Sequence, residues 1–239
     1  MITVLPTLNR LKLLQTFLNS ALECNTTTPG IIVVDTDDYS KNQKAYDSLA
    51  KPNGWTLYIS NAVTMGDKIR ETEHIWNKHD AVCILNDDHV IKTKDWDVKL
   101  LSKIDGTNFV TCQDNWMSPR KAAGATVWSI ELLKTVGIPI YPPKMTHLFI
   151  DDFWEIIGKG TGVWDIDHSV TIEHNNQLKS PQERDSTFHK VYGTGPDLTQ
   201  HELWKNDEKA CQDFLKSEYL SIRNRIRKLR GQTELVMNS

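Results

Sequence analysis

The stretch IIVVDTDD, residues 31–38, decides the fold, because four β-branched apolar residues run without interruption into acidic ones. An unbroken run of this kind is typical of a strand that is covered on both faces, as strands are in a parallel sheet flanked by helices. The stretch therefore predicts an α/β protein. In open α/β sheets ligands bind beyond the carboxyl ends of the strands, where Asp35, Asp37 and Asp38 stand in this sequence.

Apolar bursts and helical patterns alternate on both sides of this strand. Short apolar runs predict further strands at 2–7, 56–60 and 81–85. Helices are predicted between the strands, at 11–22, 40–50 and 66–78. This β-α-β rhythm indicates a parallel sheet with helices on both faces.

Beyond residue 100 the rhythm loosens. Strands are predicted at 108–112 and 125–130, followed by two short strands at 163–167 and 169–173. Prolines exclude a helix at 137–144, and a helix is expected to begin at the acidic pair 151–152 and to end at glycine. The polar stretch 174–196 predicts a mobile loop, and 203–229 predicts a long amphipathic helix. We expect one domain over residues 1–200 and a helical extension over 201–239 packed on it.

Composition is that of an ordinary globular protein. The chain has 239 residues, 39% hydrophobic and 25% charged, with a net charge of −3. This charge excludes general attraction to nucleic acid or anionic membranes as the main binding force, although a local basic patch is compatible with it. No apolar run approaches the ~20 residues of a membrane span, and no secretory signal opens the chain, so we expect a cytoplasmic protein. The scattered cysteines indicate buried thiols rather than disulfides or zinc ligands.

The segment CILNDDHVIKTKDWD (83–97) places two adjacent carboxylates, Asp87 and Asp88, at the end of an apolar run. Such a pair can simply form a turn. Adjacent carboxylates also repel each other unless a cation compensates them, which favours a divalent metal site. The pair Asp151–Asp152 and His174 strengthen that interpretation, and oxygen ligands with one imidazole suit Mn²⁺ or Mg²⁺ better than zinc. Strand alternation is expected to turn His89 away from Asp88.

Six motifs, in order along residues 1–190, resemble those of GT-A glycosyltransferases, which use nucleotide-sugar donors, and in particular the compact bacterial and phage members of the inverting type. They are TVLPTLNR (3–10), IIVVDTDD (31–38), MGDKIRETEHIW (65–76), ILNDDHVIKTKDWD (84–97), DDFWEIIGKG (151–160) and VTIEH (170–174). The resemblance implies a Rossmann-like GT-A fold with a mixed, mainly parallel sheet. The sequence departs from the family's DxD motif at Asn86, and it has Asp151 where the family more often has glutamate.

Carried over position by position, the resemblance assigns roles to individual residues. Asp88 and His174 would hold the metal, and Asp152 would be the catalytic base, with Asp151 as the alternative. Residues expected to line the donor nucleotide are Pro6, Thr7, Asn9, Arg10, Asp35, Gly66, Lys68, Arg70 and Asp87. Lys179 and Arg184, in the polar loop after His174, would close over the diphosphate, or would lie in a solvated loop.

The implied activity is transfer of a hexose or pentose from a nucleoside-diphosphate sugar, with UDP as the first choice, to a hydroxyl acceptor with Mn²⁺ or Mg²⁺. The resemblance to phage members suggests a hydroxymethylated pyrimidine in DNA as acceptor, in a host cytoplasm. The basic residues that would attract the phosphates of that DNA are Arg120, Lys121, Lys179, Arg184, Arg223, Arg227 and Arg230. Alternatives are a surface glycan or lipid-linked saccharide as acceptor, a sugar nucleotidyltransferase, and a non-catalytic carbohydrate-binding protein.

Overall fold

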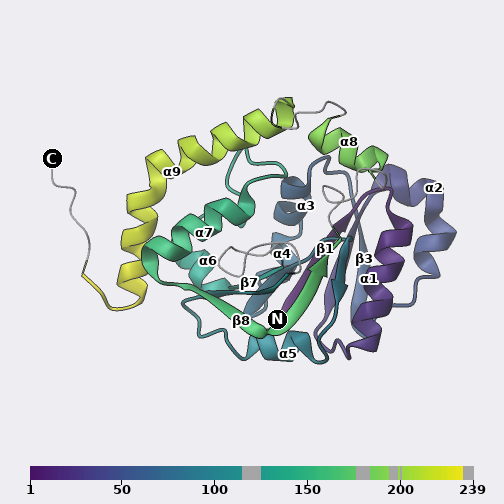
Figure 1. Ribbon diagram of the computed structural model, residues 1–239, viewed down its shortest axis with the longest axis horizontal. Helices are drawn as coiled ribbons and strands as arrows, with labels where there is room; N and C mark the ends of the chain where they lie inside the picture. The colour runs from purple at the N-terminus through teal and green to yellow at the C-terminus, as the bar shows by residue number, and fades with distance from the viewer. Residues whose placement is uncertain (115–124, 176–183, 194–198, 200, 234–239) are drawn as a thin grey trace.

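A computed structural model of the chain describes residues 1–114, 125–175, 184–193, 199 and 201–233 (Figure 1). Its strands are β1 (Ile2–Thr7), β2 (Gly30–Asp35), β3 (Trp55–Ser60), β4 (Ala81–Ile84), β5 (His89–Ile91), β6 (Phe109–Gln113), β7 (Thr126–Ser129) and β8 (Trp164–His174). Its helices are α1 (Leu11–Glu23), α2 (Thr36–Asp47), α3 (Met65–Glu71), α4 (Glu73–Trp76), α5 (Trp96–Leu101), α6 (Ile130–Val136), α7 (Ile150–Thr161), α8 (Ser186–Tyr192) and α9 (Glu202–Leu229).

The described strands form one sheet in the order β3-β2-β1-β4-β7-β6-β8-β5. The first four strands of this order are parallel, with Val4 opposite both Ile31 and Ile84. The strand β7 runs antiparallel to β4 and β6, β8 is parallel to β6, and β5 is antiparallel to β8. The predicted mixed, mainly parallel sheet with flanking helices is confirmed.

Two hydrophobic cores lie on the two faces of the sheet. Alternate residues of β2 face opposite sides, since Ile32 and Val34 belong to one core and Ile31 and Val33 to the other. The first core contains residues of α1, α2 and α5, and the second contains residues of α3, α4, α6, α7 and α9. The continuous β-branched run of β2 is thus covered on both faces, as the sequence predicts.

The long helix α9 runs along the outside of α7 (Figure 1). Its residues Cys211, Ile222 and Ile226 are buried in the second core. All the cysteines are buried free thiols, as expected. Within the described part of the chain, no helix is both long enough and apolar enough to cross a membrane.

Three predicted segments have a different form in the structure, and the elements β5, α5 and α6 were not predicted. The two short strands expected at 163–167 and 169–173 are one strand, β8, which continues through an irregularity where Asp167 Oδ1 accepts hydrogen bonds from the main chain and hydroxyl of Ser169. The helix expected at 66–78 is divided at Thr72 into α3 and α4. Part of the expected loop 174–196 is the helix α8, which begins because Asp185 accepts a hydrogen bond from the main-chain N–H of Phe188.

Candidate active site

A pocket lies at the carboxyl ends of β1 and β4. One wall comes from the turn after β1 and the start of α3, and another from α8 and the segment before α7. The acidic turn between β4 and β5, together with the end of β8, completes the lining. The lining residues are Pro6, Thr7, Leu8, Arg10, Val63, Thr64, Met65, Lys68, Asn86, Asp87, Asp88, Thr146, His147, His174, Thr187, Phe188, Tyr192 and Leu203.

Asp87 is almost fully buried in this pocket. Its Oδ2 accepts a hydrogen bond of 2.8 Å from Thr7 Oγ1, and its Oδ1 lies 3.3 Å from Arg10 Nη1. Burial raises the pKa of Asp87, and the neighbouring charge of Asp88 raises it further, while Arg10 and Thr7 act in the opposite direction. Two carboxylates that oppose each other's ionisation in a buried place create a demand for positive charge.

Asp88 pairs with His174 across the turn. His174 Nε2 lies 3.3 Å from Asp88 Oδ1, because β5 and β8 are antiparallel neighbours that place His174 opposite His89. Burial opposes the charge on Asp88, but the adjacent His174, His89 and Arg10 outweigh it and lower the pKa of Asp88. Asp88 is therefore the carboxylate of the pair that is held ionised.

The donor set fits a divalent cation. Asp88 Oδ1 is buried, and its 3.3 Å contact with His174 Nε2 falls outside hydrogen-bond geometry, so two potential ligand atoms lie side by side where a cation could be held. Asp88, His89 and His174 each have one atom that could bind a metal, and these atoms all lie within 4.8 Å of one another. On the other side of the His174 ring, Asp114 Oδ2 lies 3.7 Å from Nδ1, a position from which a carboxylate can orient a metal-binding imidazole.

The expectation that His89 points away from Asp88 is wrong. Asp88 belongs to the turn that precedes β5, so strand alternation does not govern it. The Nδ1 atom of His89 accepts a hydrogen bond of 3.2 Å from the main-chain N–H of Asn86, so the proton of the neutral ring is on Nε2. A protonated nitrogen cannot be a ligand, which leaves Asp88 and His174 as the residues that could hold the metal.

Arg10 connects the acidic turn to α8. Its guanidinium lies 3.3 Å from Asp87 and 3.9 Å from Asp88, while its Nε and Nη2 donate hydrogen bonds of 2.9 and 3.2 Å to Asp185. Thr187 at the start of α8 also donates a hydrogen bond to the carbonyl oxygen of Leu8. Helix α8 therefore covers the pocket in a position fixed by the turn after β1.

The residues predicted to bind the nucleotide divide into two groups. Pro6, Thr7, Arg10, Lys68 and Asp87 line the pocket. Lys68 is buried, and its Nζ lies 3.4 Å from the carbonyl oxygen of Thr7 and 3.5 Å from Oδ2 of Asp35, a predicted nucleotide residue that is not part of the lining.

The other predicted nucleotide residues support the pocket from outside. Asn9, with a φ of 53°, makes the turn after β1 and donates its main-chain N–H to Asp38. Gly66 and Arg70 contact the segment before α7. Arg184 lies over the ring of Phe188, at 4.9 Å, while Lys179, Arg120 and Lys121 lie outside the described residues.

The acidic pair predicted to supply the base stands in the first turn of α7. The side chain of Asp151 is half-buried and that of Asp152 is exposed. Burial raises the pKa of Asp151 to about 6, and the charges of Asp152 and Glu155 contribute to the rise, while main-chain hydrogen bonds oppose it. The charge of Asp151 acts on Tyr141 and Tyr192, and Tyr192 lines the pocket, so Asp151 is within electrostatic range of the pocket lining.

Sequence reasoning missed three residues of this region. Asp114 precedes residues 115–124 and no spacing relates it to His174. His147 is in the pocket lining, although a lone histidine is usually structural. Asp185 has a sequence signal, because Asp followed by Ser-Thr-Phe is a helix N-cap pattern within a stretch that was predicted to be a loop.

Solved structures show what this fold resembles. A mannosyltransferase of Pyrobaculum calidifontis, PcManGT, in complex with GDP-Man and Mn²⁺, superposes with a TM-score of 0.55 at 13% identity over 95% of this chain and 72% of that one. Glucosyl-3-phosphoglycerate synthase of Mycobacterium tuberculosis, in complex with Mn²⁺, UDP and glucosyl-3-phosphoglycerate, has a TM-score of 0.55 at 12% identity over 89% and 78%.

A third similar structure is S. aureus TarS, with a TM-score of 0.54 at 10% identity over 95% of this chain and 80% of a shorter form of TarS. The chain covers 43% of a longer TarS structure. No family model and no curated protein matches the sequence. The chain has the GT-A fold of nucleotide-sugar glycosyltransferases.

Proposed function

We propose that this protein is a metal-dependent glycosyltransferase that moves a sugar from a nucleoside-diphosphate sugar, with UDP as the first choice, to an acceptor hydroxyl with inversion. The observation that carries the proposal is the buried pair of Asp88 Oδ1 and His174 Nε2, 3.3 Å apart in the pocket at the carboxyl ends of the sheet. Similar structures support it, since PcManGT binds GDP-Man and Mn²⁺ and the mycobacterial synthase binds UDP and Mn²⁺.

The pocket has the charges that a nucleoside diphosphate needs. Asp88 and His174 would hold Mn²⁺ or Mg²⁺, which when bound supplies positive charge to the departing diphosphate. Arg10 and Lys68 add two cationic side chains of the protein to the same pocket. Because both are fixed by ion pairs before the donor arrives, they act as a preorganised site for negative charge.

The base in this proposal is Asp151, with Asp152 as the alternative. The acceptor oxygen forms its bond to the anomeric carbon while the bond from that carbon to the diphosphate oxygen breaks, and the hydroxyl proton passes to the carboxylate. Attack from the face opposite to the diphosphate inverts the anomeric centre. Asp151 is favoured because it is half-buried and its charge acts on Tyr192 of the pocket, whereas Asp152 is exposed.

The acceptor is defined here by its hydroxyl group. The DNA acceptor suggested by the sequence relies on the basic residues of α9, and those side chains have contacts inside the protein. Arg230 donates hydrogen bonds to the carbonyl oxygens of Thr161 and Gly162 at the end of α7, and Arg227 donates one to Thr233. Arg230 therefore helps to fasten α9 to α7, while Arg227 contacts the chain just beyond the helix, so both side chains already have partners that a polyanion would have to replace.

A donor and acceptor panel tests the proposed function. Purified protein with Mn²⁺ is incubated with UDP- and GDP-sugars, alone and with hydroxymethylpyrimidine DNA or saccharide acceptors, and products are weighed by mass spectrometry. We expect release of nucleoside diphosphate from at least one donor, lost with EDTA and in Asp88→Asn. Consumption of nucleoside triphosphates with release of pyrophosphate would instead assign the protein to the nucleotidyltransferases.

A further inference from the structure

The carboxylate of Asp207, in α9, holds the segment Thr146–Leu148. Its Oδ1 accepts hydrogen bonds of 3.0 and 2.9 Å from the main chain and hydroxyl of Thr146. Its Oδ2 accepts hydrogen bonds of 2.8 and 2.7 Å from the main-chain N–H groups of His147 and Leu148. Asp207 is 0% exposed, so all of these hydrogen bonds are shielded from water.

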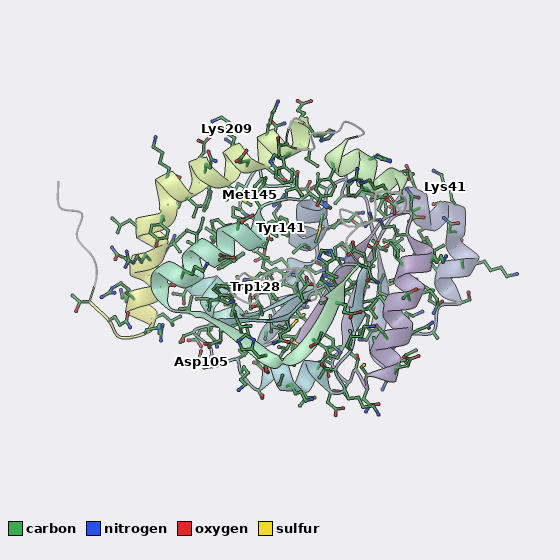
Figure 2. All side chains as sticks on the ribbon, in the orientation of Figure 1. Lys41, Asp105, Trp128, Tyr141, Met145 and Lys209 are labelled. Carbon is green, nitrogen blue, oxygen red and sulfur yellow. The ribbon has the colours of Figure 1, made fainter. Side chains whose placement is uncertain are left out.

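The same segment and the residues just before it also make hydrogen bonds to α3. The main-chain N–H of Gly66 donates a hydrogen bond of 2.8 Å to the carbonyl oxygen of Thr146, and Arg70 donates one of 3.0 Å to that of Tyr141. A Cβ atom at Gly66 would lie 2.8 Å from the carbonyl oxygen of Met145, so only glycine permits this approach. Figure 2 shows Tyr141 and Met145 on the side of the molecule along which α9 runs, and both are fully buried.

Thr146 and His147 of this segment line the pocket. The charges of Arg10, Lys68 and Asp88 act on the His147 ring, which places it among the groups of the proposed donor site. Burial lowers the pKa of His147 to about 4, with Arg10 and Lys68 adding to the effect while Asp207 and Asp88 oppose it. At neutral pH the ring is therefore uncharged, with one N–H donor and one acceptor nitrogen.

We propose that His147 hydrogen-bonds to the diphosphate-sugar part of the bound donor, and that Asp207 is the positioning residue that presents it. This inference rests on the proposed function, and it makes α9 part of the donor site rather than an extension packed on a complete domain. An imidazole N–H suits a phosphate oxygen or a sugar hydroxyl in a pocket that already has two cationic side chains. The rigid segment beneath it fixes the direction of that hydrogen bond before the donor binds.

The test is steady-state kinetics with the best donor, together with calorimetric binding of the matching nucleoside diphosphate in Mn²⁺. Asp207→Asn turns an amide N–H₂ group toward main-chain N–H groups, so the segment can no longer keep its position. We expect kcat/KM for the donor to fall on the order of 10- to 100-fold. His147→Ala should show a loss of similar size, and His147→Gln, which keeps an N–H donor, should recover part of it.

The pair of variants separates positioning from general stability. If Asp207 acts through His147, the double variant Asp207→Asn/His147→Ala loses little more than either single variant. Asp213→Asn is the matched control on the same helix, because Asp213 is exposed and pairs only with its helix neighbour Lys209 in the described structure, at 2.7 Å. It should keep wild-type kinetics. If Asp207→Asn does not fold, Gly66→Ala displaces the same segment from α3 and should give the same loss.

Two results would overturn the inference while leaving the proposed function intact. The first is wild-type kcat and KM in His147→Ala. The second is an Asp207→Asn protein that melts at a lower temperature but shows unchanged kinetics and nucleotide affinity well below that temperature. A wild-type protein that binds no nucleoside diphosphate would overturn the proposed function, and this inference with it.

Discussion

Asp151 and Asp152 are neighbours in sequence with different surroundings. Asp152 is exposed, while Asp151 is half-buried and its charge acts on Tyr141 and Tyr192. The pKa of Asp151 is raised to about 6, first by burial and then by the charge of Asp152. A base with a pKa near the working pH is efficient in proton transfer, which suits Asp151 to the role. The sequence alone indicates that one member of the pair is the base but gives no reason to prefer the buried one.

The first residue-scale prediction is a pH profile. A base works in its ionised form, so kcat/KM should fall as the pH drops through the pKa of Asp151, about 6. Asp152→Asn removes a negative charge that raises this pKa, and the acidic limb should move to lower pH with turnover retained. Asp151→Asn should lower kcat by ~10²- to 10⁴-fold. The opposite pattern, with turnover lost in Asp152→Asn and kept in Asp151→Asn, would return the role to Asp152.

His89 shows where residue-level reasoning from sequence reaches its limit. The sequence identifies Asp88 and His174 as candidate metal residues, and the structure brings them to 3.3 Å. It cannot show that His89 lies beside them, because that depends on a turn whose geometry is set by the hydrogen bond between Asn86 and His89. Asp114 is hidden from sequence for a similar reason, since only the parallel pairing of β6 and β8 places the end of β6 beside His174.

Helix α8 is the element whose position depends most on a few contacts. Asp185 has two functions there, because it caps the helix at Phe188 and receives the guanidinium of Arg10. The Arg10–Asp185 pair is partly exposed, so its contribution to stability is small, ~1 kcal/mol or less. Loss of a helix N-cap typically costs ~1 kcal/mol, and both losses would act on the helix that covers the pocket.

The element-scale prediction concerns Asp185→Asn and Arg10→Lys. Asp185→Asn removes the charge that pairs with Arg10 but keeps an oxygen that can cap the helix, so amide hydrogens of α8 should exchange faster by roughly 5-fold at most, which corresponds to ~1 kcal/mol. Arg10→Lys removes the bidentate contact with Asp185 but keeps a positive charge and the helix cap, so it should raise the exchange rate of α8 by a smaller factor. Hydrogen exchange followed by mass spectrometry measures both. Equal exchange in wild type and Asp185→Asn would show that α8 is held by its apolar contacts alone.

Elements with strong local patterns were predictable, and elements defined by distant contacts were not. The β-branched run of β2 and the apolar spacing of α9 predict their structures because burial imposes those patterns directly. Strand β8 looks like two short strands because Asp167, His168 and Ser169 interrupt its apolar pattern, yet Asp167 bonds to Ser169 and the strand continues. The hydrogen bonds from Thr146–Leu148 to Asp207 join residues that are far apart in the chain, so no local sequence pattern predicts them.

On the scale of the whole molecule, the pocket exists because the two halves of the chain close on each other. The first half supplies the carboxyl ends of β1 and β4, with Arg10, Lys68 and Asp88. The second half supplies His147, His174 and the helix α8. Since α9 joins the second hydrophobic core and contributes Leu203 to the pocket lining, the site and the fold share the same packing. Binding of a donor should therefore stabilise the folded chain as a unit.

The most direct test of the central claim is calorimetric titration of the protein with UDP, and with GDP in parallel, in Mn²⁺ and in EDTA. The proposed site predicts binding in Mn²⁺ that weakens at least ~10-fold in EDTA and in Asp88→Asn, because the cation held by Asp88 and His174 contributes to diphosphate affinity. Asp213→Asn should bind like wild type. Equal affinity with and without the metal, or unchanged affinity in Asp88→Asn, would contradict the account.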